Sequence, residues 1–204
     1  MYTQPDVAFS ECLYSALQLL GREYYQTSFG HKFLVVTPLL VHTASGLAKR
    51  FVAPQHARKL RSLFTVTGYS ALLFFLPVHY MIHREYPADP SPPIYEFGPS
   101  ELDFEYVKYG LQQHPWRSWL LYAGILTSVA WHASEGMQII WNTWLRGSLG
   151  SLKSNVKTRA LTAAAVIAPV LSGLLVVSRE PLMAFTSSIT RFEGAFWKSF
   201  IYRI

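Results

Sequence analysis

The sequence predicts an all-α integral membrane protein in which four transmembrane helices form a bundle, with an amphipathic interfacial helix at each end. Two observations predict this fold class. Half of the 204 residues are hydrophobic and only 15% are charged, whereas a soluble domain carries about a quarter charged residues. The charges are also clustered, so that four long apolar stretches contain almost none of them, which is typical of membrane-spanning segments.

The first two apolar stretches predict helices at about 32–50 and 61–83. The first, "FLVVTPLLVHTASGLA", is bounded by Lys32 and Lys49. At about 1.5 Å per residue it is short for a hydrocarbon core of about 30 Å, but the flanking basic side chains can extend to the headgroups. The second, "SLFTVTGYSALLFFLPVHYMI", is long enough to span a bilayer.

The other two stretches predict helices at about 116–145 and 159–179, which complete a bundle domain over residues 32–180. The third helix continues past Glu135 into further apolar sequence. The fourth has small residues at every fourth position, a pattern that lets helices approach closely in lipid. These small residues are Ala164, Ala168 and Ser172.

Residues 1–31 and 181–204 each predict an amphipathic helix, because their apolar residues recur at helical spacing. An apolar stripe beside basic residues suits a helix that lies among lipid headgroups. Packing of the same stripe against the bundle is the alternative, and the sequence leaves both open. The stripe of the first segment is Phe9, Cys12, Leu13, Ala16, Leu17 and Leu20, and that of the second is Phe185, Ile189, Phe192, Phe196 and Phe200.

The loops between the predicted spans differ in charge. The loops after the first and third spans contain Lys and Arg but no acid, whereas the loop 84–115 is acidic. The positive-inside rule therefore places the two basic loops in the cytosol and the acidic loop across the membrane. The acidic loop is Pro-rich at first and then predicts a short helix, Glu101 to Gln113, with Ser100 as its N-cap. Its acids are Glu85, Asp89, Glu96, Glu101, Asp103 and Glu105.

Two histidines lie in matching patterns within apolar sequence. His42 is followed by Gly46, and His132 by Gly136. The first and third helices run in the same direction, so the two imidazoles are expected at comparable depth and could bind one haem b iron axially. The alternative is a histidine that hydrogen-bonds between helices, with the glycine serving close packing. His79 is expected nearer the opposite surface.

Several polar residues of the spans have two interpretations. The carboxylate of Glu135 could pair with His132 or with a loop lysine, or it could lie in water at the membrane edge. A set of hydroxyl-bearing residues could line a groove that moves lipid, or serve ordinary helix packing. This set is Thr43, Ser45, Thr67, Ser70, Thr127 and Ser128.

The sequence argues against several classes of function. The single cysteine, Cys12, allows no intrachain disulfide and indicates no thiolate metal site. There is no Gly-rich phosphate loop, no Ser-His-Asp spacing and no zinc pattern, so we expect no catalytic activity. The net charge of +6 indicates contact with anionic lipid headgroups. Nucleic-acid binding is not expected, since no basic run with interleaved aromatic residues stands outside the apolar segments.

Three long phrases resemble the fungal MCP-one mitochondrial adapter family, and the likeness covers roughly Gly21 to Ser178. They are "GREYYQTSFGHKFLVVTPLLVHTASGLAKR", "TGYSALLFFLPVHYMIHREYP" and "FEYVKYGLQQHPWRSWLLYAGILTSVAWHASEG". The resemblance implies a multi-pass protein of the mitochondrial outer membrane in mitochondrial lipid homeostasis, and the yeast member recruits a bridge-like lipid-transfer protein. The family's membrane domain is also similar to the cytochrome b anchor subunits of succinate dehydrogenase and fumarate reductase. That analogy implies His42, His79 and His132 as candidate haem ligands.

The chain departs from the family pattern on its N-terminal side. Family members have a further spanning helix before the first span matched here, preceded by a cytosolic arm with a Pro-x-Pro-type motif that binds the partner. Only about twenty residues precede the match in this sequence, so we expect it to be N-terminally short. Its triplet of that type, Pro90-Ser91-Pro92, lies in the loop predicted across the membrane.

The sequence thus predicts a non-enzymatic adapter or scaffold that requires no cofactor. Its expected partners are membrane lipids, a bridge-like lipid-transfer protein and further copies or other subunits in an oligomer. One alternative is a b-type haem protein, a redox or anchor subunit, that uses His42 and His132. The other is a helix bundle that moves lipid directly.

Overall fold

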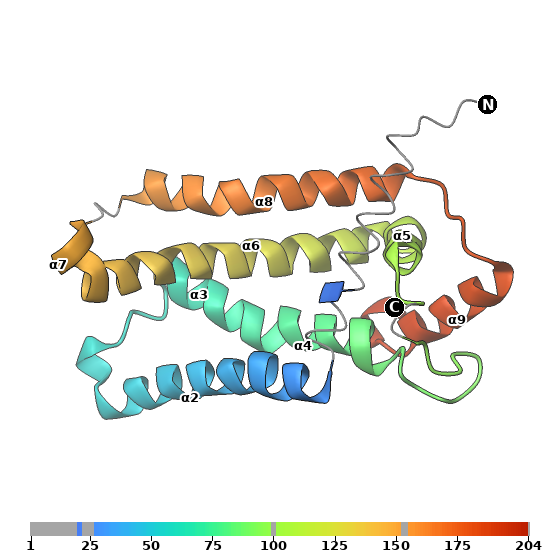
Figure 1. Cartoon of the computed structure of the whole chain (residues 1–204), viewed down its shortest axis with the longest axis horizontal. Coiled ribbons are helices and arrows are strands. Elements are labelled where there is room, and N and C mark those ends of the chain that lie inside the picture. Colours follow the sequence, from blue (N-terminus) through green and yellow to red (C-terminus); the bar gives the residue numbers. More distant parts are fainter. Residues whose placement is uncertain (1–19, 22–26, 99–100, 152–154, 204) are drawn as a thin grey trace. The chain divides into compact units, whose positions relative to one another are not determined.

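The structure is a computed structural model, and all of the regular elements that it describes are helices (Figure 1). This agrees with the predicted all-α class. The helix predicted over residues 1–31 lies almost entirely outside the described residues. The chain divides into two compact units, Met1–Arg58 and Lys59–Ile204, and each is described by itself. The described residues are 20–21, 27–98, 101–151 and 155–203.

The first unit contains one long helix that coincides with the span predicted at 32–50. A π-helical segment, η1 (Gly30–Val36), continues into α2 (Thr37–Val52), and the short turn η2 (Pro54–His56) follows. None of the residues of α2 is buried. A helix that leaves its apolar side chains exposed in this way suits a lipid environment.

The second unit begins with an unbroken helix over Leu63–Glu85, which coincides with the span predicted at 61–83. The hydroxyl of Ser62 caps it by accepting the Thr65 N–H at 3.3 Å, so its first turn has a partner for one of its free donors. Along its length, α-helical and π-helical segments alternate. They are α3 (Leu63–Ser70), η3 (Ala71–Phe75), α4 (Leu76–Tyr80) and η4 (Met81–Glu85).

Two further long helices coincide with the spans predicted at 116–145 and 159–179. The second of them, α8, begins with a reciprocal capping box between Asn155 and Thr158. The Asn155 side chain accepts the Thr158 N–H at 2.7 Å. The elements are α6 (Pro115–Ile140), continued by η5 (Trp141–Leu145) and α7 (Arg146–Leu149), and then α8 (Val156–Arg179).

Two helices of the described chain are long and apolar enough to cross a bilayer, Leu63–Glu85 and Val156–Arg179. Few of their residues are buried inside the protein, so their side chains are available to lipid. Of the four transmembrane helices that the sequence predicts, these two are candidate spans by length and apolarity. The segments Gly30–Val52 and Pro115–Leu145 are helices, and their crossing of the membrane stays a prediction.

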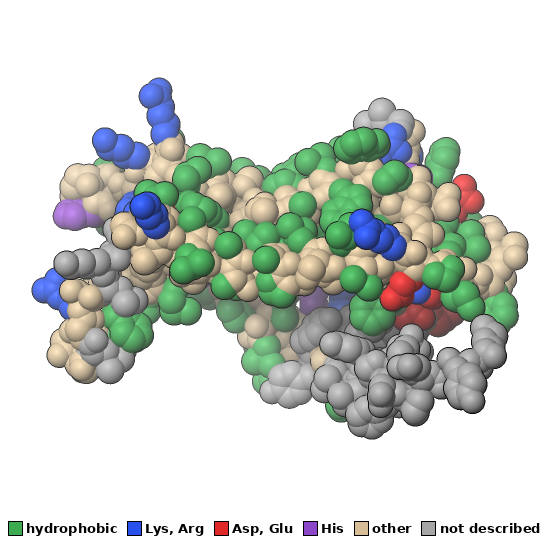
Figure 2. Space-filling view, turned by 90° about the horizontal axis from the view of Figure 1, so that it is seen from above, with side chains coloured by type: hydrophobic (Ala, Val, Ile, Leu, Met, Phe, Trp, Pro, Cys, Tyr) green, Lys and Arg blue, Asp and Glu red, His purple; other side chains and the backbone are tan. Residues whose placement is uncertain are grey.

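In the second unit, α6 lies between α8 and the helix Leu63–Glu85 (Figure 1). Gly124 permits the close approach, because a Cβ at that position would lie 2.1 Å from the ring of Phe75. The hydroxyls of Ser70 and Ser128 meet across the same interface at 3.2 Å. Small residues and interhelical hydrogen bonds are the usual means by which helices associate in lipid. Figure 2 shows hydrophobic side chains along the body of the molecule and acidic side chains at the end that carries α5 and α9.

A hydrophobic core lies at that end, just beyond the two most apolar helices. Most of it is built by residues 86–98, 101–113 and 180–203, which we call the cap, and the adjoining helices contribute Ile82 and Leu121. At its centre Ile94, Tyr106 and Phe196 are almost fully buried. The helices of the cap are α5 (Phe104–Gln113), α9 (Thr186–Trp197) and α10 (Phe200–Arg203).

The structure decides between the two interpretations of the C-terminal segment. Phe192 and Phe196 of its apolar stripe are buried in the cap core, so the segment packs against the rest of the unit. Phe185 and Phe200, at the two ends of the stripe, are 82% and 61% exposed. Phe185 precedes the first residue of α9, and Phe200 belongs to α10.

The short helix predicted in the acidic loop is present but begins later than expected. The carboxylate of Asp103 accepts the Glu105 N–H at 2.8 Å, and α5 starts at Phe104. Glu101, the first residue of the predicted helix, precedes α5, and its carboxylate accepts the Gly98 N–H at 2.7 Å. The predicted N-cap, Ser100, lies outside the described residues. Asp103 takes the capping role because an aspartate oxygen accepts free N–H groups at a helix start as well as serine does.

Candidate functional site

The cap is held to the end of the membrane helices by buried hydrogen bonds. The hydroxyl of Tyr106 on α5 donates to the backbone carbonyl of Ile82 at 2.9 Å. The hydroxyl of Ser118 on α6 donates to the carbonyl of Gly110 at 2.6 Å, and it also lies 3.1 Å from the hydroxyl of Tyr202. Burial raises the pKa of Tyr106 well above its usual range, so this phenol remains a neutral donor. The cap is therefore fixed relative to the helices that carry it.

Ion pairs join the acidic loop to the C-terminal segment. Arg191 on α9 lies 2.5 Å from the carboxylate of Glu101, and its guanidinium stands over the ring of Phe97 at 4.1 Å. Lys198 pairs with Asp89 in the same way. The acidic character of the loop and the basic character of the C-terminal segment, both visible in the sequence, thus serve partly to hold one against the other.

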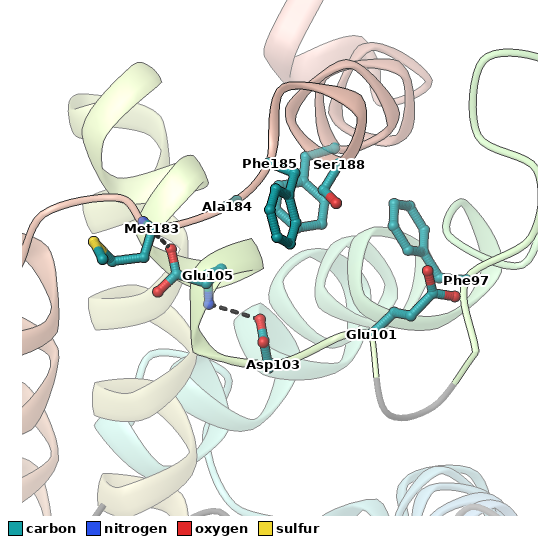
Figure 3. Close-up of a pocket in the computed structure, with 9 residues that line it drawn as sticks. Phe97, Glu101, Asp103, Glu105, Met183, Ala184, Phe185 and Ser188 are labelled. Carbon is teal, nitrogen blue, oxygen red and sulfur yellow. Dashed lines mark hydrogen bonds between the residues drawn. The ribbon is translucent and has the colours of Figure 1, made fainter.

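A pocket of about 200 Å³ opens between the start of α5 and the segment that leads into α9 (Figure 3). Figure 3 shows Phe97 and Glu101 on one side, Phe185 and Ser188 above, and Glu105 with Met183 on the other side. The pocket combines aromatic rings with carboxylates, and no Lys or Arg is among its lining residues. They are Phe97, Glu101, Asp103, Glu105, Met183, Ala184, Phe185, Ser188 and Phe192.

The carboxylates of the pocket are engaged to different degrees. The hydrogen bond from Arg191 lowers the pKa of Glu101, with a further contribution from the Gly98 N–H. Glu105 accepts the Met183 N–H at 2.7 Å and pairs with Lys108 at 2.7 Å. Burial lowers the pKa of Lys108, but its bonds to Glu105 and to the neighbouring Glu180 outweigh this effect and raise it.

Asp103 is the pocket carboxylate that none of the described basic residues pairs with. One of its oxygens caps α5 through the Glu105 N–H, and its side chain is otherwise exposed. Arg191 pairs with Glu101, and Lys108 is shared between Glu105 and Glu180, so these bases do not neutralise the charge of Asp103. The electrostatics of the pocket therefore favour a cation.

His132, a predicted haem ligand, takes part in a helix–helix contact. Its Nδ1 lies 2.8 Å from the carbonyl oxygen of Phe64, and its ring stacks on that of Phe64 with centroids 4.3 Å apart. The space for the imidazole is provided by Gly68 on α3, where a Cβ would lie 2.6 Å from the ring. Gly136, the glycine of the sequence pattern, would place its Cβ 3.8 Å from Phe64. His132 therefore makes the hydrogen bond between helices that the sequence offered as the alternative to haem binding.

Neither His79 nor His42 takes part in this contact. His79 is eleven positions beyond Gly68 on the same helix, which is about 17 Å at the helical rise, so His79 and His132 cannot reach one iron. His79 instead faces His83, with ring centroids 4.6 Å apart. His42 lies on α2 in the first unit, and its pairing with His132 stays a prediction. No group of three or more metal-binding side chains occurs among the described residues.

Glu135 has a different partner from those the sequence suggested. It is buried between α6 and α8, where it lies 3.1 Å from Arg159 and accepts the indole N–H of Trp131 at 2.8 Å. The expectations of pairing with His132 or a lysine, and of exposure to water, are therefore wrong. The pairing of Glu135 with Arg159 is hard to predict from sequence, because Arg159 belongs to the next helix, α8.

The hydroxyl groups proposed as a groove lining are used within the helices. Thr67 donates to Leu63 O at 2.7 Å, and Thr127 donates to Ala123 O at 2.7 Å. In the first unit Thr43 and Ser45 likewise donate to carbonyls of their own helix, and Ser70 meets Ser128 as described above. These bonds favour ordinary helix packing over a polar groove.

The pocket residues were not found as a set by sequence reasoning. Asp103 and Glu105 were noted only as acids of a loop, and Phe185 and Phe192 only as an amphipathic stripe. Met183 carried no signal. The sequence feature that could have pointed to the pocket is the opposite charge of the acidic loop and the C-terminal segment, because opposite charges predict that the two segments pair.

A family model described as MDM10-complementing protein 1, transmembrane domain, matches residues 74–180, which is more than half of the chain. The matched range begins within the helix Leu63–Glu85, includes the acidic loop, α5 and α6, and ends just after α8. No curated protein and no solved structure matches the chain.

Proposed function

Because the chain belongs to the family of the MDM10-complementing protein 1 transmembrane domain, we propose that it is a non-enzymatic adapter of the mitochondrial outer membrane in lipid homeostasis and organelle contact. The family resemblance seen in the sequence is confirmed, and the chain is a membrane protein. The mitochondrial location, the adapter role and the partners are the parts that we propose.

The observation that carries the proposal is the extent of the family match. Residues 74–180 join two apolar helices and the acidic part of the cap in one continuous region. An adapter needs a membrane anchor and a folded surface that is fixed to it. The bond from Tyr106 to Ile82 and the pairing of Lys108 with Glu180 at 3.1 Å supply that fixed connection. This arrangement supports a rigid scaffold better than a flexible tether.

The proposed partners are membrane lipids, a bridge-like lipid-transfer protein, and further copies or other subunits in an oligomer. The test is to tag the full chain in its native cell, delete its gene and measure mitochondrial phospholipids and contact sites. We expect the tag on the mitochondrial outer membrane and altered lipid composition after deletion. A tag on the plasma membrane, with unchanged lipids and contacts, would refute the proposal.

Complementation with point variants tests whether the cap is the adapter surface. In the deletion strain, we expect the Arg191→Glu variant to insert into the membrane but not to restore contact sites. The new carboxylate repels Glu101, the partner of Arg191, and so separates the C-terminal segment from the acidic loop. Glu193→Gln is the matched control, since this exposed acid lies on the same helix outside the pocket. Full rescue by Arg191→Glu would show that adapter function does not depend on the cap.

A further inference from the structure

We propose that the cap pocket binds the ammonium group of a zwitterionic phospholipid headgroup, choline or ethanolamine. The inference goes beyond the adapter function and does not depend on it, since it concerns a binding site that purified protein can reveal. Three properties of the pocket support it: its charge, its exposed aromatic ring, and its size and position.

The charge of the pocket suits a single cation. Three carboxylates line it. Arg191 pairs with Glu101, and Lys108 is shared between Glu105 and Glu180, and neither base belongs to the lining. Asp103 remains, with one oxygen on the N-terminus of α5 and an exposed side chain. An anionic headgroup without an ammonium would meet this negative charge and be repelled.

An exposed aromatic ring of the pocket provides a face for a cation. Phe97, Phe185 and Phe192 all line it, but Phe97 and Phe192 are only 6% and 2% exposed. Phe185 is therefore the ring that offers an open face, and quaternary ammonium groups are recognised by aromatic faces. The guanidinium of Arg191 already occupies one face of Phe97 at 4.1 Å, so that face is taken within the cap itself. Phe185, at 82% exposure, leaves most of its ring available to a second cation beside Asp103.

Size and position favour a lipid headgroup over a peptide. At about 200 Å³ the pocket is smaller than the roughly 300 Å³ at which sites for drug-sized ligands begin, so it admits one small group. Met183, which is 75% exposed, follows the last residue of α8, Arg179, by four positions. The mouth of the pocket is therefore next to the end of a membrane-spanning helix, where headgroup ammonium ions are concentrated.

The test measures which lipids remain on the full chain purified in detergent. The probes are dioleoyl phosphatidylcholine, dioleoyl phosphatidylethanolamine and dioleoyl phosphatidylglycerol, which share their acyl chains, and native mass spectrometry counts the bound molecules. We expect the choline and ethanolamine lipids to be retained in preference to the glycerol lipid. Asp103→Asn and Phe185→Ala should each reduce this preference by about two- to fivefold, the range expected for loss of one cation–aromatic or exposed charge contact.

The variants are chosen so that folding is retained. Asparagine caps a helix as well as aspartate, so Asp103→Asn removes charge without removing the cap of α5. Phe185 is exposed, and the matched control Phe200→Ala removes another exposed ring outside the pocket. Equal retention of all three lipids, or an equal loss of preference in Phe200→Ala, would overturn the proposal. So would Asp103-dependent binding of an oligolysine peptide without lipid preference, which would instead indicate a basic protein partner.

Discussion

The guanidinium of Arg159 lies 3.1 Å from the carboxylate of Glu135, and this ion pair joins α8 to α6. The side chain of Glu135 is only 7% exposed and that of Arg159 24%, so both charges are largely removed from solvent. Trp131 satisfies the second carboxylate oxygen from within α6. The pair therefore joins the two helices at one defined position along their length.

Removing one member of this pair should strongly destabilise the protein. Glu135→Ala leaves the Arg159 charge buried without its partner, which typically costs about 3–5 kcal/mol. We expect a large fall in unfolding temperature in detergent, measured by tryptophan fluorescence or calorimetry. The double variant Glu135→Ala/Arg159→Ala should lose less than the sum of the two single variants. If the losses of stability in the two single variants simply add up in the double variant, the two residues are not coupled. Lys157→Ala, at an exposed position of the same helix as Arg159, serves as a control.

Gly68→Ala should destabilise the contact between α3 and α6. The added methyl would lie 2.6 Å from the ring of His132, which is held by its bond to the Phe64 carbonyl, and such overpacking costs about 1–3 kcal/mol. Gly173→Ala is the matched control, because no atom lies within 4 Å of its Cβ position and alanine favours a helix. If both variants unfold at the wild-type temperature, the His132 packing described above is wrong.

Ser118→Ala should loosen the cap. Its hydroxyl is fully buried and donates to Gly110 O at 2.6 Å. The Gly110 carbonyl keeps the His114 N–H as a donor, so the variant loses one hydrogen bond, at a cost of about 0.5–1.5 kcal/mol. Limited proteolysis should then cut the cap faster than in the wild type. The exposed Ser187→Ala on α9 should behave like the wild type. Equal cleavage of the two variants would contradict the structural role given to Ser118.

Acidification should destabilise the cap through His114. Burial, and secondly the charge of Arg117, lower the pKa of His114 below its usual 6.5, and its Nε2 is buried with no hydrogen-bond partner in the described structure. Because the unfolded chain then binds more protons, stability is retained above the unfolded pKa and falls as the pH drops below it. The unfolding temperature should decrease between about pH 7.5 and about pH 5.5. His114→Phe should reduce this decrease, and an unchanged pH profile would exclude His114 as its source.

The positions of the helices could be predicted from sequence with little error. A helix in lipid makes its backbone hydrogen bonds within itself, so an apolar run of sufficient length is enough to locate Leu63–Glu85 and Val156–Arg179. The caps at Ser62 and Asn155 follow from equally local chemistry. The histidines were also placed on helices correctly, but sequence could not say what each imidazole would meet.

The sequence by itself therefore determined the class of the protein, the extent of its apolar helices and the opposite charges of its two end segments. Only the tertiary structure decided that those segments fold together into a cap with a pocket, and that Arg159 is the partner of Glu135. The physical reason is the distance along the chain. Glu101 and Arg191 are separated by 90 positions, and which of several bases approaches an acid depends on how the intervening helices pack.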